Sequence, residues 1–138
     1  MDIIDLHTHT TASDGSLTPT ELVEAARRAG LKAVAITDHD TVDGVAEALA
    51  AGQALGQAVV PGVEISLQGY EAQGMPGSMH LLGLFLDHAD PGLAAGLARL
   101  QGARAERNPQ IVAKFNQLGI PLTLEEVEAF AGGELIGR

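Results

Sequence analysis

Two histidines near the start of the chain, His7 and His9, have the spacing of a metal-binding pair. Side chains alternate along a β-strand, so residues two positions apart lie on the same face. Residues 1–10 are typical of a strand, which predicts that Asp5, His7 and His9 share one face. Histidine is the commonest protein metal ligand, and a strand end presents two rings rigidly. A metal site is therefore expected here, although a His-x-His pair alone is a weak signal.

Further candidate ligands lie on or beside three other predicted strands. His39 follows a strand expected at 32–37, Glu64 lies on one expected at 58–67, and His80 is on one expected at 79–86. In a parallel α/β barrel the carboxyl ends of the strands and the loops after them converge on one mouth. A carboxylate such as Glu64 can also bridge two cations. The pattern predicts one multinuclear metal site built from six side chains: His7, His9, Asp14, His39, Glu64 and His80.

Most of these residues also have a purely structural explanation. The first two histidines could end a strand that faces water, Asp14 could belong to an ordinary Asp-Gly turn, and His80 could be a hydrogen-bonded core residue. After His39, either Asp40 or Thr41 is expected to cap the next helix, which is compatible with metal binding by the histidine. Glu64 differs, because an unpartnered charge on an apolar strand would be costly to bury. The fifth histidine, His88, is assigned to a solvated turn.

Alternating strands and helices are expected to position the six candidate ligands. A capping box at residues 18–21, with Pro19 at the first helical position, predicts a helix that ends at Gly30. Strand–helix–strand–helix–strand order is typical of a parallel α/β sheet or barrel. The short connection before 79–86 predicts antiparallel pairing with the strand at 58–67. Three further helices are expected, at about 42–55, at 92–118 with a break before Pro109, and after a capping box at 123–126.

Composition restricts the metal ligands and the binding partners that the chain can have. The chain has 138 residues, enough for one domain, and 46% of them are hydrophobic. It has no cysteine, so a metal would be held by imidazole and carboxylate, which suits zinc, manganese or iron. A formal charge of −10 repels duplex nucleic acid. Because no apolar run approaches ~18 residues, neither a signal peptide nor a membrane span is expected, and a cytoplasmic location follows by default.

Taken together, the motifs resemble those of the PHP (polymerase and histidinol phosphatase) family. The similarity covers residues 5–10, 14–15, 37–40, 61–64 and 80–83, in the order and spacing of that family. The branch that the chain most resembles comprises phosphatases of 3′,5′-bisphosphonucleotides and nucleases acting on the 5′ ends of short RNAs. Residues 104–108 are similar to that branch as well.

The resemblance implies an α/β fold, a distorted seven-stranded β/α barrel that binds up to three divalent metals, with Mn²⁺ favoured and Zn²⁺ or Fe²⁺ possible. Carried over by position, His7, His9 and Glu64 would hold one ion, Asp14 and His39 a second, and Glu64 with His80 a third. No catalytic residue is implied beyond a metal-bound water. Asp5 and Asp38 would orient the imidazoles. The candidates for binding substrate phosphate are Arg104, Arg107, Asn108 and Arg138.

The family pattern is longer than this chain. Family members supply further ligands from a second half, and residues 133–138 resemble the stretch that precedes the first of them. We therefore expect residues 1–90 to form the N-terminal half of the barrel and residues 91–138 to start a helical insertion that covers the substrate. As a truncated chain it would lack one ligand for each metal and could be inactive on its own.

Three functions are compatible with the residues. The first is a metal-dependent phosphoesterase that hydrolyses phosphate monoesters of small nucleotides (3′,5′-bisphosphonucleotide or AMP-like) or the 5′ ends of short single-stranded RNA. The second is a noncatalytic metal-binding PHP module. The third is another PHP phosphatase, such as a histidinol-phosphate phosphatase. Duplex nucleic acid and membranes are not expected partners.

Overall fold

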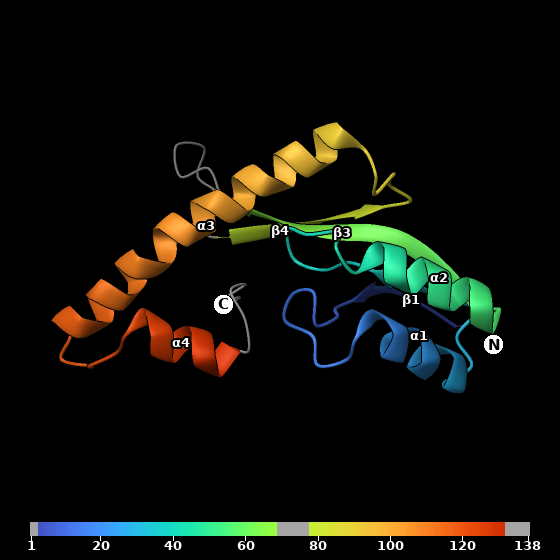
Figure 1. The fold of residues 1–138 in the computed structure, drawn as a ribbon, viewed down its shortest axis with the longest axis horizontal. Helices are drawn as coiled ribbons and strands as arrows, with labels where there is room; N and C mark the ends of the chain where they lie inside the picture. Colours follow the sequence, from blue (N-terminus) through green and yellow to red (C-terminus); the bar gives the residue numbers. More distant parts are fainter. Residues whose placement is uncertain (1–2, 69–77, 132–138) are drawn as a thin grey trace. The chain divides into compact units, whose positions relative to one another are not determined.

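The computed structural model of the chain describes residues 3–68 and 78–131. It divides into two compact units, Met1–Asp90 and Pro91–Arg138. Figure 1 shows the elements in chain order. Among the described residues the strands all lie in the first unit, which contains β1 (Ile4–Thr8), α1 (Pro19–Arg28), β2 (Ala33–Ile36), α2 (Val45–Leu55), β3 (Ala58–Gln68) and β4 (Ser78–Leu84). The second unit holds α3 (Pro91–Gln117) and α4 (Leu124–Ala131). The predicted role of the second unit, which is to cover the substrate, stays a prediction.

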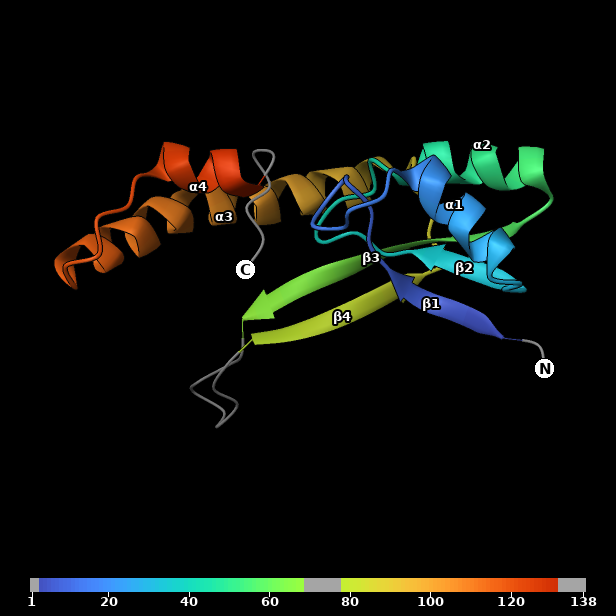
Figure 2. The same ribbon diagram turned by 90° about the horizontal axis from the view of Figure 1, so that it is seen from below.

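The four strands form one curved sheet in the order β1-β2-β3-β4. The pairs β1·β2 and β2·β3 are parallel, as strands joined by crossover helices must be. Strand β4 runs antiparallel to β3, with Glu64 opposite Leu82, which confirms the predicted antiparallel pairing. Figure 2 shows α1 and α2 on the same side of this sheet. Strand β3 continues through Pro61 without interruption and carries Glu64 near its middle.

Helix α1 begins where the sequence predicts. The Thr18 hydroxyl accepts a hydrogen bond from the Glu21 amide (3.2 Å), and the Glu21 carboxylate accepts one from the Thr18 amide (2.9 Å). This capping box satisfies two backbone donors that the first turn would otherwise leave unpaired. The apolar face of the helix is buried, and Val23 packs with Ile36, Val45 and Ala48 in the core. The helices therefore hold the sheet from one side.

Helix α2 begins later than predicted, at Val45 rather than near residue 42, and its N-cap is Gly44 with no side-chain cap. The prediction that Asp40 or Thr41 caps it was wrong. Asp40 instead accepts a hydrogen bond from the Ser66 amide, and the Thr41 hydroxyl accepts one from the Asp43 amide. The hydrogen bonds of Asp40 and Thr41 thus hold the segment between β2 and α2 in place before the helix begins.

Helix α3 runs through Pro109 without the predicted break. Proline removes one backbone donor, and Pro109 lies at an exposed position of the helix. The second capping box is confirmed, since the Thr123 hydroxyl accepts from the Glu126 amide (3.2 Å) and the Glu126 carboxylate accepts from the Thr123 amide (2.9 Å). Within residues 3–68 and 78–131, the helices are all too short or too polar to span a bilayer.

The packing of α2 against β3 predicts a specific cost for a small substitution. A Cβ added to Gly52 would lie 2.5 Å from Val59 Cγ2 and 2.8 Å from the Gln57 carbonyl oxygen. We expect Gly52→Ala to lower the free energy of unfolding by about 1–3 kcal/mol, measured by urea denaturation. Gly96→Ala is the matched control, because a Cβ there meets nothing within 4 Å, and alanine favours a helix by up to about 1 kcal/mol. Equal effects of the two substitutions would contradict this packing.

Candidate metal centre

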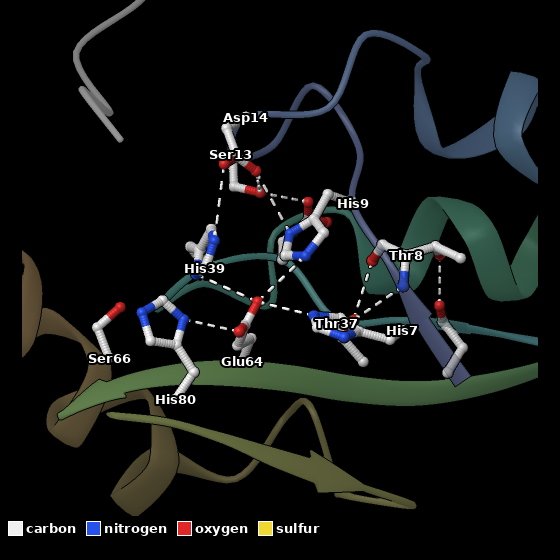
Figure 3. A network of polar contacts seen from close by, with 12 residues as sticks. His7, Thr8, His9, Ser13, Asp14, Thr37, His39, Glu64, Ser66 and His80 are labelled. Atoms are coloured by element: carbon white, nitrogen blue, oxygen red, sulfur yellow. Dashed lines mark hydrogen bonds and ion pairs between the residues drawn. The ribbon is translucent and has the colours of Figure 1, made fainter. Parts of the chain in front are cut away.

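The carboxylate of Glu64 is the centre of a ring of imidazoles. It is buried, with only 4% of the residue exposed, on a strand that is otherwise largely apolar. Its Oε2 atom lies 3.0 Å from His7 Nε2, 3.1 Å from His9 Nε2 and 3.4 Å from His39 Nδ1. Its Oε1 atom lies 2.7 Å from His80 Nδ1. Figure 3 shows the four rings pointing toward this one carboxylate.

Asp14 supplies a second carboxylate beside two of the same rings. Its Oδ1 atom lies 3.4 Å from His9 Nδ1, and its Oδ2 atom lies 3.6 Å from His39 Nε2. Both of these imidazoles therefore lie between Asp14 and Glu64, with one ring nitrogen toward each (Figure 3). All six side chains predicted as ligands are brought together at one place.

Three overlapping groups of these side chains could each hold a metal ion. Within each group the ligand atoms lie within 4.8 Å of one another: His7, His9 and Glu64; His9, Asp14 and His39; and His39, Glu64 and His80. Two ligand atoms that are each about 2.1 Å from one ion are separated by roughly 3.0–3.4 Å. Most of the nitrogen–oxygen separations at this centre fall in or near that range.

Two buried ring nitrogens provide an independent test of fit. His9 Nδ1 and His39 Nδ1 have no hydrogen-bond partner among the described residues, although each is 3.4 Å from a carboxylate oxygen. A buried polar atom without a partner is costly, because it loses its contact with water and gains nothing in return. A cation between ring and carboxylate would satisfy both groups. The donor set, four imidazoles and two carboxylates, suits a divalent ion.

An irregularity in the β1·β2 ladder places the first two histidines. The register advances by three residues in β1, from Asp5 to Thr8, against two in β2, from Val34 to Ile36. Such a bulge redirects the side chains of the longer strand. The Thr37 hydroxyl closes it, accepting from the Thr8 amide (3.1 Å) and donating to the Thr8 carbonyl (3.0 Å). Both His7 and His9 reach Glu64 from this strand end.

Asp38 holds the loop that carries Asp14. Its carboxylate is buried and accepts hydrogen bonds from the Thr10 amide (2.6 Å), the Thr10 hydroxyl (2.8 Å) and the Ser13 hydroxyl (2.7 Å). Within the part of the chain that the structure describes, its hydrogen bonds go to this loop and not to an imidazole. Asp5, the other carboxylate expected to orient the imidazoles, accepts from the His7 backbone amide (3.2 Å). Each acts on the backbone beside a ligand.

The electrostatics of the centre favour a neutral His39 ring beside a charged Glu64 carboxylate. Burial lowers the pKa of His39, and the neighbouring His9 and His80 lower that pKa further, although Glu64 and Asp14 oppose the shift. Burial alone would raise the pKa of Glu64, but the hydrogen bonds from His7 and His80 and the nearby His39 hold that pKa below its usual range. A neutral imidazole and an ionised carboxylate are the forms that bind metals.

The predicted substrate-binding residues lie in the second unit. Arg107 and Asn108 lie on α3, where Arg107 is exposed and Asn108 is partly buried. Arg104 also belongs to α3, and Arg138 lies outside the described residues. Their role in binding substrate stays a prediction. His88 belongs to none of the three candidate metal groups.

Sequence reasoning named Asp38 as a residue that orients the ligands, but it missed the partners of Asp38 and the role of Thr37. The run Thr37-Asp38-His39-Asp40 was recognised as a motif, but the bulge contact of Thr37 and the loop contacts of Asp38 were not. The available signal was that both polar residues come directly after an apolar strand, and the structure shows that both side chains are fully buried. Their partners, Thr8, Thr10 and Ser13, are more than 20 residues earlier in the chain and could not be read from spacing.

Comparison with known proteins decides the family. Residues 5–120 match the model of the PHP domain. This chain belongs to the PHP domain family. It is 40% identical over 131 residues to a 5′-3′ exoribonuclease of Haemophilus influenzae, covering 95% of this chain and 46% of that protein. It is 41% identical over 117 residues to a 3′,5′-nucleoside bisphosphate phosphatase of Chromobacterium violaceum, covering 85% of this chain and 39% of the relative. Both the predicted family and the predicted branch are confirmed.

A solved structure extends this similarity to the fold. A protein of Chromobacterium violaceum, named an amidohydrolase and crystallised with sulfate and no metal, superposes with a TM-score of 0.84 at 37% identity. The superposition covers 98% of this chain and 46% of that structure. The PHP chain described here thus spans about half the length of the relatives it matches. The predicted fold class, an α/β half-barrel, is confirmed.

The hydroxyl that closes the β1 bulge can be tested with a pair of substitutions. Thr37→Val removes the side-chain acceptor of the part-buried Thr8 amide, which we expect to cost about 1–3 kcal/mol of unfolding free energy. Thr37→Ser keeps the hydroxyl and loses only a methyl group, which we expect to cost about 1 kcal/mol. Urea denaturation compares the two variants. A Ser variant less stable than the Val variant would contradict the proposed role of the hydroxyl.

The depressed pKa of His39 predicts how stability depends on pH. As pH falls below the ordinary histidine value of 6.5, this side chain takes up a proton in the unfolded chain before it does so in the folded one. The free energy of unfolding of EDTA-treated protein should therefore fall below about pH 6.5, and the low pKa of Glu64 adds a second decline below its ordinary value of 4.5. Denaturation between pH 7.5 and 5 measures the first decline, which should be smaller in His39→Gln. A rise in stability on acidification would contradict it.

Proposed function

We propose that this protein is a metal-dependent phosphoesterase that hydrolyses phosphate monoesters of small nucleotides or of the 5′ ends of short RNA. The observation that carries the proposal is the buried Glu64 carboxylate with four imidazoles within 3.4 Å and Asp14 beside two of them. We assign His7, His9, Asp14, His39, Glu64 and His80 as the ligands of up to three divalent ions, with Mn²⁺ preferred over Zn²⁺ or Fe²⁺.

The charge of the ligand set favours an anionic substrate. Four neutral imidazoles and two carboxylates carry two negative charges, so two divalent cations would already leave the centre net positive. This local field opposes that of a chain whose formal charge is −10. The overall charge disfavours duplex nucleic acid, whereas the centre would attract a single phosphate group. A phosphate monoester is the substrate class that fits both conditions.

The bound ions would supply the chemistry of hydrolysis, since they polarise the phosphoryl oxygens and lower the pKa of water to near neutrality. The residues of this chain keep the ions in place and correctly spaced. Glu64 lies in two of the three ligand groups, so its carboxylate can tie two ions together. Asp38 fixes the loop of Asp14, and Thr37 fixes the strand end of His7 and His9. Rigid ligands of this kind keep the geometry needed for phosphoryl transfer.

The nucleotide character of the substrate is supported by the relatives. One of the two enzymes described above is named a 5′-3′ exoribonuclease and the other a 3′,5′-nucleoside bisphosphate phosphatase. The related structure binds sulfate, a tetrahedral dianion of the same shape as phosphate. Arg104, Arg107, Asn108 and Arg138 are the candidates for binding a phosphate at a distance from the hydrolysed bond. A panel of a 3′,5′-bisphosphonucleotide, 5′-AMP, a 5′-phosphorylated short RNA and histidinol phosphate would rank the substrates.

Replacing Glu64 tests the proposed centre directly. Glu64→Gln keeps the size of the side chain but removes the charge that two ions would share. Loss of an ion forfeits several kcal/mol of transition-state stabilisation, so we expect kcat/KM with Mn²⁺ to fall by about 10³-fold or more. Phosphate release from the substrate panel is the measurement, and EDTA should abolish it in the wild-type protein.

His88→Ala is the matched control, because His88 belongs to none of the candidate groups, and its activity should equal that of the wild type. Full activity of Glu64→Gln would dispose of the proposal. Near-stoichiometric metal without turnover on any substrate would instead support the noncatalytic PHP module.

A further inference from the structure

Asp40 is a buried acid in an unusual backbone conformation. Only 1% of the residue is exposed, and its φ is 52°. Apart from glycines, Phe85 is the other residue in the described part of the chain with a positive φ. The left-handed region costs energy for most residues, although aspartate and asparagine tolerate it better than others. A strained and buried residue directly after His39 calls for a physical cause.

The hydrogen bonds around Asp40 extend the sheet beyond the end of β2. His39 and Glu64 form an isolated parallel bridge. The Glu64 amide donates to the Asp38 carbonyl (3.1 Å), and the Asp40 amide donates to the Glu64 carbonyl (3.0 Å). In a regular parallel ladder the next donor, the Ser66 amide, would bond to the main-chain carbonyl of Asp40. Here it donates to Asp40 Oδ1 instead, at 2.8 Å.

We infer that Asp40 is a positioning residue of the metal centre, and that its carboxylate replaces its own carbonyl as the last acceptor of the β2·β3 ladder. The chain can then leave the sheet at Asp40, in the left-handed conformation, without leaving the Ser66 amide unpaired. His39 stays paired with Glu64, which keeps its Nδ1 atom 3.4 Å from Glu64 Oε2. The consequence for metal binding rests on the proposed function, because it assumes that His39 and Glu64 hold ions.

This role depends on shape rather than on charge. Asp40 belongs to none of the three groups of candidate ligands among the described residues. Asparagine has the same shape, tolerates a positive φ and offers a carbonyl oxygen to the Ser66 amide. Glycine tolerates the backbone conformation but offers no acceptor, and alanine provides neither. The three substitutions therefore distinguish the effect of losing the hydrogen-bond acceptor from the effects of backbone strain and of losing the charge.

Mn²⁺ titration by calorimetry of the wild-type protein, Asp40→Asn, Asp40→Gly and Asp40→Ala tests the inference. We expect the Asn variant to bind within about threefold of wild-type affinity, and the Gly and Ala variants about tenfold or more weakly, as for other residues that support metal ligands. Gln57→Ala is the control for general destabilisation, because the Gln57 amide group is buried at the start of β3 and donates to the Leu31 carbonyl (3.1 Å). Its Mn²⁺ affinity should equal that of the wild type even where its melting temperature falls.

Hydrogen exchange of the Ser66 amide in EDTA-treated protein provides a readout that needs no metal. This amide should be protected in the wild-type and Asn proteins and should exchange about tenfold faster or more in the Gly and Ala variants. Wild-type affinity in the Gly variant, or an Asn variant as weak as the Gly variant, would overturn the inference. If the wild-type protein bound no Mn²⁺, the proposed function would fail, and the exchange of the Ser66 amide would by itself decide the role of Asp40.

Discussion

A carboxylate buried in the middle of a strand needs positive charge or several hydrogen-bond donors around it. Ionised groups lose several kcal/mol of hydration when they leave water, and a protein accepts that loss only where the charge is compensated. Glu64 is compensated by four imidazoles that come from β1, from the segment after β2, and from β4. The strand order β1-β2-β3-β4 brings all three sources to Glu64 on β3.

The residues that hold the ligands are themselves buried polar groups with specific partners. Thr37 closes the bulge of β1, Asp38 holds the loop of Asp14, and Asp40 ends the ladder beside His39. The contacts of these three residues reach three different segments, so the short stretch 37–40 after β2 connects β1, the loop of Asp14 and β3. Gly44 completes the stretch, because a Cβ there would lie 3.0 Å from Thr10 Oγ1 and 3.1 Å from Asp38 Oδ2. Close packing of this kind is what keeps metal ligands rigid.

Much of this centre could be predicted from the sequence, because chemically distinctive residues followed strands. The pairing of His7 with His9 rests on strand periodicity and the antiparallel pairing of β4 on connection length, which are local features. The choice of His80 as a ligand also rested on the family resemblance. The start of α2 and the course of α3 were predicted wrongly. In α2, Asp40 and Thr41 have partners other than the helix, and in α3 an exposed proline is tolerated. The contacts of Thr37, Asp38 and Asp40 are long-range, and propensity carries no information about them.

The central claim is that the carboxylate of Glu64 and the imidazoles around it bind metal ions rather than only one another. Anomalous diffraction at the manganese edge, from crystals of the protein grown with Mn²⁺, tests this claim most directly. We expect a peak within coordination distance of Glu64 Oε2 and of the Nε2 atoms of His7 and His9. A fully hydrogen-bonded cluster with no anomalous peak within coordination distance of Glu64 would contradict it.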